Sequence, residues 1–203
     1  MKKIKLINWL IILGVSIFSI FYLFFGNHER DLYKILIIIS IIPVMLLPFL
    51  ANKLFALNID PEIELVYLLF IFFAYFLGTI LNLYDKIIIY DKIIHGLSGV
   101  IASILAIIIL VKSKCYDKNP IWMNVLFIIC ITLSVAALWE IFEFTNDKLF
   151  NKDAQKVLKT GVDDTMLDII IAFIFSIIFS VIYAIEAKTK KKILITKFAN
   201  NIK

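Results

Sequence analysis

The chain has 203 residues, of which 62% are hydrophobic, and its formal net charge is +5. A mean hydropathy of +0.97 excludes an ordinary soluble globular domain. Its two cysteines, Cys115 and Cys130, are too few for a thiolate metal cage. We attribute the positive charge to membrane topology and contact with anionic lipid, and we expect no binding to nucleic acid.

Long apolar segments follow one another along the chain, with no long soluble stretch between them. Each has about 17 residues or more, which is enough for a helix to cross a hydrocarbon core of roughly 30 Å. Because backbone groups cannot stay unpaired in lipid, helix is the form expected for these segments. The sequence therefore predicts an all-α polytopic membrane protein. It is one membrane domain over 1–203 with six transmembrane spans, at 7–25, 35–52, 63–83, 87–111, 121–145 and 165–187.

The first three spans carry local signals at their ends or within them. The basic start at residues 1–5 resembles that of a signal peptide, but the apolar run after it is too long, so we expect a retained first helix. Pro43 and Pro48 predict a kinked second span. Asp60 and Pro61 have the residue types of an N-cap and a first helical position, and predict the start of the third span.

The distribution of lysine and arginine predicts the orientation. With six spans both termini lie on one side, and basic residues are more frequent on that side, mainly through the basic tail at 188–203. We therefore expect cytoplasmic termini.

Spans four to six carry acidic residues and one histidine at the ends that share one membrane face. These are Asp91 and His95, Glu140 and Glu143, and Asp164 and Asp168. Residues four apart stack on one helix face, and small or hydroxylic residues continue each polar stripe deeper into its span. Because a charged side chain at the centre of a span costs roughly 2.5–3.5 kcal/mol, the stripes predict that these spans pack around a polar seam.

The acids at this face do not all point to the same role. Asp91 and Asp164 lie where a helix N-cap would lie, so a capping role and a site role both stay open for them. His95, Glu140 and Asp168 lie about a turn deeper, and we interpret them as the candidate catalytic residues.

So many carboxylates cannot all ionise in one pocket without compensation. Either some are protonated, or a cation lies among them. Carboxylates with one imidazole suit Mg²⁺, Mn²⁺ or Zn²⁺, so the sequence allows a divalent metal with ligands from Asp91, His95, Glu140, Glu143, Asp164 and Asp168. No strong metal motif such as His-Glu-x-x-His is present in the sequence.

The longest connection, residues 146–164, alternates apolar residues with Lys152, Lys156 and Lys159. One interpretation is a solvated loop. The other is a cationic lid that attracts phosphate or lipid head groups.

Three sequence elements carry a family resemblance: Asp-Lys-x-x-His-x-x-x-Gly from Asp91, Glu-x-x-Glu from Glu140, and Asp-Thr-x-x-Asp from Asp164. In this order they resemble the YjdF-like (DUF2238) family of bacterial membrane proteins and, more distantly, VanZ-like proteins. The resemblance covers about residues 84–185. It implies that the six acidic and histidine positions are signature residues and that the protein is multi-pass in a bacterial plasma membrane. It implies no particular reaction.

Three functions stay open at this point. The first is a metal-assisted hydrolase or transferase on lipid-linked phosphate at the outer face, and the second is a proton-coupled transporter. The third is a non-catalytic scaffold whose polar seam holds helices together. Membrane lipids are the expected partners in all three.

Overall fold

The computed structural model describes residues 2–26, 31–56, 59–87, 89–191 and 193–202, and within these ranges the regular structure is entirely helical. By length and composition, five of its helices could each cross a membrane: Lys2–Phe25, Pro61–Ile80, Tyr90–Lys112, Ile121–Phe150 and Asp163–Thr189. A sixth crossing results if the bent pair Leu32–Met45 and Leu47–Phe55 is one span. The predicted all-α membrane fold is confirmed.

The contacts divide the chain into two compact units, Met1–Tyr90 and Asp91–Lys203. We describe each unit separately. The expectation of a single membrane domain over the whole chain stays a prediction.

The first unit contains α1 (Lys2–Phe25), α2 (Leu32–Met45), α3 (Leu47–Phe55), α4 (Pro61–Ile71), η1 (Phe72–Ile80) and α5 (Leu83–Lys86). The second predicted span bends by 45° between α2 and α3, at a break flanked by Pro43 and Pro48. Proline removes a backbone donor and clashes with the preceding turn, which explains the bend. The third span continues α4 into η1, a stretch of π-helix that its apolar sequence did not predict.

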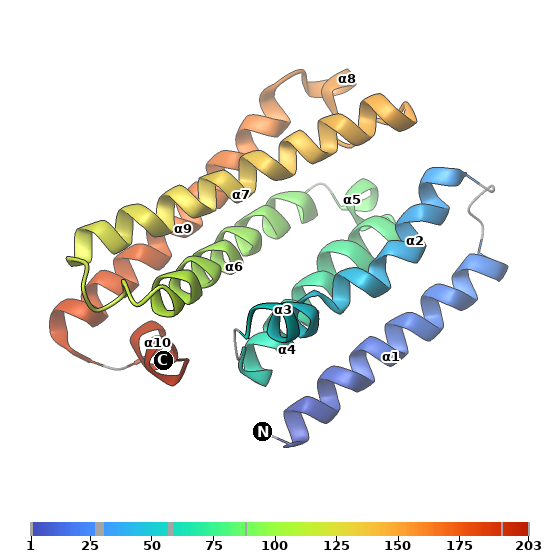
Figure 1. The fold of residues 1–203 in the computed structure, drawn as a ribbon. Helices are drawn as coiled ribbons and strands as arrows, with labels where there is room; N and C mark the ends of the chain where they lie inside the picture. The colour runs from blue at the N-terminus through green and yellow to red at the C-terminus, as the bar shows by residue number, and fades with distance from the viewer. Residues whose placement is uncertain (1, 27–30, 57–58, 88, 192, 203) are drawn as a thin grey trace. The chain divides into compact units, whose positions relative to one another are not determined.

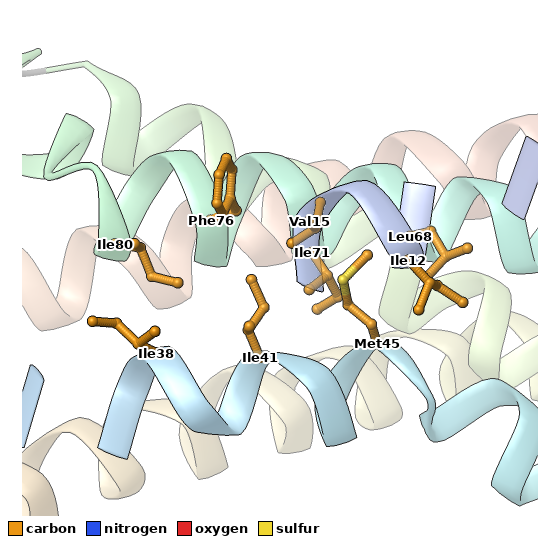
Figure 2. Close-up of a cluster of buried hydrophobic side chains, with 9 residues drawn as sticks. All are labelled: Ile12, Val15, Ile38, Ile41, Met45, Leu68, Ile71, Phe76 and Ile80. Carbon is orange, nitrogen blue, oxygen red and sulfur yellow. The ribbon is translucent and has the colours of Figure 1, made fainter. Parts of the chain in front are cut away.

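Helices α1, α2, α4 and η1 enclose the core of this unit (Figure 2). Figure 2 shows the aliphatic and aromatic side chains of these helices pointing toward one another, among them Ile41, Met45 and Leu68, which are fully buried. A buried carboxylate lies in the same unit. Glu64 accepts hydrogen bonds from the side-chain amides of Asn8 and Asn52, each at 3.2 Å.

The second unit contains α6 (Tyr90–Lys112), α7 (Ile121–Phe150), α8 (Val157–Thr160), α9 (Asp163–Thr189) and α10 (Ile195–Asn201). The boundary between the units follows Tyr90, the first residue of α6. Helices α7 and α9 lie side by side, and short helices flank them, α8 at one end and α10 at the other (Figure 1). Helix α6 packs very closely against α9 at Gly99. A Cβ added to this glycine would lie only 2.5 Å from the Ala172 carbonyl oxygen. The three predicted polar stripes therefore do belong to helices that pack together.

One carboxylate, that of Glu186, connects α9 to α10 at the end of the second unit farthest from α8. Glu186 accepts hydrogen bonds from the backbone N–H groups of Leu194, Ile195 and Thr196, and from the Thr196 hydroxyl, at 2.8–3.3 Å. These contacts place α10 against α9, with Ile195 and Ala199 buried. The sequence predicted a basic tail over 188–203 and did not predict this helix.

A candidate site of acids, histidine and lysines

The candidate site lies where α6 and α9 begin and α7 ends. Asp91 is the second residue of α6. Asp164 is the second residue of α9, whose N-cap is Val162. The alternative that these two aspartates are N-caps is therefore wrong. Both side chains form ion pairs instead, and Asp168, one turn deeper on α9, joins them.

Lys92 forms ion pairs with two aspartates of α9. Its Nζ donates hydrogen bonds of 2.6 Å to Asp164 Oδ1 and 2.6 Å to Asp168 Oδ1, and it lies 3.5 Å from Asp91 Oδ2. Charge-assisted bonds of this length are the stronger kind, and here they are largely shielded from solvent. One ammonium thus joins the first turns of α6 and α9.

A second ammonium comes from the connection between α7 and α9. Lys156 Nζ lies 2.8 Å from Asp91 Oδ2 and 3.8 Å from Asp164 Oδ2. Burial lowers the pKa of Lys156, but its hydrogen bond and charge interaction with Asp91 outweigh this effect and leave the pKa above its ordinary value. Lys156 therefore stays a cation that neutralises the acidic cluster.

His95 faces the carboxylate oxygens of Asp91 and Asp168 that the lysines leave open. Its Nε2 lies 3.4 Å from Asp91 Oδ1 and 3.7 Å from Asp168 Oδ2. Each of these three buried residues can offer one ligand atom within 4.8 Å of the others. This is a donor set that a divalent cation could occupy.

Glu140 lies near this cluster but makes different contacts. The side-chain amide of Gln155 donates to Glu140 Oε2 at 3.2 Å and to the Glu140 backbone carbonyl at 3.1 Å. Glu140 Oε1 is buried and has no hydrogen-bond partner. Glu140 is also absent from the three-residue donor set.

The other predicted residues are placed as follows. Glu143 is partly buried, accepts a hydrogen bond of 2.8 Å from Trp139 Nε1, and lies close enough to His95 and Glu140 for their charges to interact. Lys152 and Lys159 are exposed. Of the three lysines expected to hold a head group, Lys156 forms ion pairs with the acids of the cluster.

Two residues that balance and cover the cluster, Lys92 and Gln155, were not among the predicted site residues. For Lys92 the place beside Asp91 in the first motif was an available signal. Gln155 lies in an irregular segment, where no periodic pattern tells which side chains point inward.

Comparison with known proteins gives a family but no reaction. A curated uncharacterized protein from Thermotoga maritima is 35% identical over 125 residues, which is 61% of this chain, and the match spans 62% of that protein's length. No solved structure matches the chain. The family model described as "Predicted membrane protein (DUF2238)" matches residues 7–189. The chain therefore belongs to the DUF2238 family of predicted membrane proteins.

Proposed function

We propose that this protein is a membrane hydrolase or transferase that uses a divalent metal ion to act on lipid-linked phosphate. Asp91, His95 and Asp168 are the metal ligands in this proposal. The observation that carries it is the approach of His95 Nε2 to one open oxygen on each of the two aspartates, at 3.4 and 3.7 Å.

These distances fit a coordination shell. Nitrogen and oxygen ligands about 2.0–2.2 Å from a tetrahedral ion lie about 3.3–3.6 Å apart. The distance of 3.4 Å is inside this range and the distance of 3.7 Å is just beyond it. Two carboxylates and one imidazole also suit the metals expected from the sequence, Mg²⁺, Mn²⁺ or Zn²⁺.

The lysines support the same assignment because they use the other oxygens. Lys156 contacts Asp91 through Oδ2, and Lys92 contacts Asp168 through Oδ1. Oδ1 of Asp91 and Oδ2 of Asp168 are the oxygens turned to His95. In metal sites, residues that hydrogen-bond to the ligands usually fix the orientation of those ligands. The lysines would orient the two carboxylates in this way and leave one oxygen of each for the ion.

A divalent ion at this position would polarise a phosphate oxygen and stabilise the charge that develops during transfer. The ammonium groups of Lys92 and Lys156 would attract the anionic group to the same place. A lipid-linked substrate is favoured because the site lies at the ends of membrane-length helices. The segment that covers it also presents apolar residues outward, including Leu158, which is 87% exposed. With the termini in the cytoplasm, as the basic tail favours, the site faces the outer leaflet.

Metal analysis of the purified protein tests the proposal. Wild type is compared with His95→Ala and with Ser98→Ala, a control one turn further along α6. The Ser98 hydroxyl donates to the His95 backbone carbonyl at 2.7 Å. We expect about one equivalent of divalent metal in wild type and in Ser98→Ala, and loss of the metal in His95→Ala. Phosphate release from vesicles that contain phosphatidic acid or a polyprenyl diphosphate should follow the metal content.

A folded wild type that takes up no Mg²⁺, Mn²⁺ or Zn²⁺ at stoichiometric level would overturn the metal assignment. The same result would favour a proton-coupled carrier, since His95 also lies where it could exchange a proton with either Asp91 or Asp168.

A further inference from the structure

Glu140 is the carboxylate of this region whose contacts are incomplete. Its side chain is 5% exposed, and Oε1 has neither a partner nor contact with solvent. Oε2 accepts from Gln155, which is also buried. A half-satisfied carboxylate inside a protein is costly, so its open oxygen needs an explanation such as a catalytic role or a bound donor.

The other buried acids of the second unit are satisfied. Asp164 and Asp168 share Lys92, Asp91 is paired with Lys156, and Glu186 accepts hydrogen bonds from four donors. Among all residues that the structure describes, Glu140 Oε1 is the one carboxylate oxygen that is both buried and unpartnered. The unpartnered oxygen is therefore a feature of Glu140 and not a general property of buried acids in this unit.

Glu140 also lies beside the proposed metal ligands without belonging to them. Gln155 and Lys156 are neighbours in one covering segment, and they contact Glu140 and Asp91 respectively. Glu143, one turn after Glu140, lies close enough to both Glu140 and His95 for electrostatic interaction with them. Glu140 is nevertheless outside the group whose ligand atoms converge. This position suits a residue that accepts a hydrogen bond from a small hydroxyl group next to the metal ligands.

We propose that Glu140 is the proton acceptor of the site. Its Oε1 accepts the hydrogen bond of a hydroxyl group, from water or from an acceptor alcohol, that enters beneath Gln155. As the hydroxyl oxygen forms its bond to phosphorus, its O–H bond breaks and the proton moves to Glu140 Oε1. The bond from phosphorus to the leaving oxygen breaks, and the leaving oxygen then takes this proton. This role rests on the proposed function for the phosphate reaction.

Phosphate release and metal content of Glu140→Gln, measured beside wild type, test whether Glu140 accepts the proton. The substitution keeps an oxygen for the Gln155 amide but removes the oxygen that would take the proton. Glu186→Gln is the control, because the Glu186 carboxylate has four hydrogen-bond donors and no part in the site, and it should keep its phosphate release.

A folded Glu140→Gln that keeps both its metal and the wild-type rate of phosphate release would overturn the proposal. The metal content separates this outcome from failure of the metal assignment. We expect the variant to keep its metal and to lose phosphate release by about 10²–10⁴-fold, the usual contribution of a general base. Loss of metal from Glu140→Gln would make it a ligand and would also overturn its role as acceptor. A wild type without metal whose phosphate release still falls in Glu140→Gln would overturn the metal assignment alone.

Discussion

Substitution of Gly99 by alanine should weaken the crossing that holds the site together. A Cβ at this position would lie 2.5 Å from the Ala172 carbonyl oxygen and 3.0 Å from its Cα. Both are backbone atoms of α9, so no side-chain rotation can relieve the contact, and α6 and α9 must move apart. Such overpacking costs about 1–3 kcal/mol in a well-packed interior.

Alanine also has an intrinsic advantage over glycine in a helix, worth up to about 1 kcal/mol. Gly14 supplies the control for this gain, because it lies inside α1 and a Cβ there would meet nothing within 4 Å. The difference between Gly99→Ala and Gly14→Ala therefore isolates the clash. For a chain of this size, about 1–3 kcal/mol corresponds to a Tm difference of about 2–12 °C.

The assay is thermal unfolding of both variants and wild type in the same detergent, followed by tryptophan fluorescence at one scan rate. We expect Gly14→Ala to unfold at or above the wild-type temperature and Gly99→Ala to unfold below it. If Gly99→Ala unfolds at the same temperature as Gly14→Ala or higher, the close crossing of α6 and α9 is refuted.

Other consequences of the ion pairs can be measured in the same way. Lys92→Met should cost about 3–5 kcal/mol, because it leaves two aspartates without their shared cation, whereas Lys159→Met at an exposed position should leave Tm unchanged. The pKa of Lys156 is raised in the fold, so its stabilisation is fully present below its unfolded pKa of about 10.4 and is lost as the pH rises through the higher folded value. Unfolding temperatures between pH 8 and 11.5 should therefore fall more for wild type than for Lys156→Met, and parallel curves would contradict this. Glu186→Ala should release α10, which faster tryptic cleavage of the C-terminal segment would reveal and an unchanged digestion rate would exclude.

Several features of this protein could be predicted from the sequence because they depend on one-dimensional patterns. Length and hydropathy determine the membrane-crossing helices, and lipid leaves the backbone no alternative to helix. The alternating direction of successive spans brings Asp91, Glu140 and Asp168 to one end of the bundle. Pro43 and Pro48 mark the bend of the second span for a local reason, the missing backbone donors.

The pairing of the charges was decided by tertiary structure. Lys92 and Asp164 are 72 residues apart, and their contact depends on how closely α6 approaches α9 at Gly99. Helical periodicity relates residues of one helix, so it cannot predict a contact between residues this far apart in the sequence. The stripes predicted which residues share a face, but they could not assign His95 to one oxygen of each aspartate and the lysines to the others.

The same reason explains the residues that sequence analysis did not single out. Glu64, Gln155 and Glu186 are polar residues that the sequence alone would place in solvent or at a membrane surface. Their burial depends on partners from other segments: the side-chain amides around Glu64, the Glu140 carboxylate beside Gln155, and the start of α10 at Glu186. Sequence alone therefore determined which helices are long and apolar enough to cross a membrane, and which end of them carries the acids. The packing of those helices decided which acids are neutralised by lysine and which carboxylate oxygen is buried without a hydrogen-bond partner.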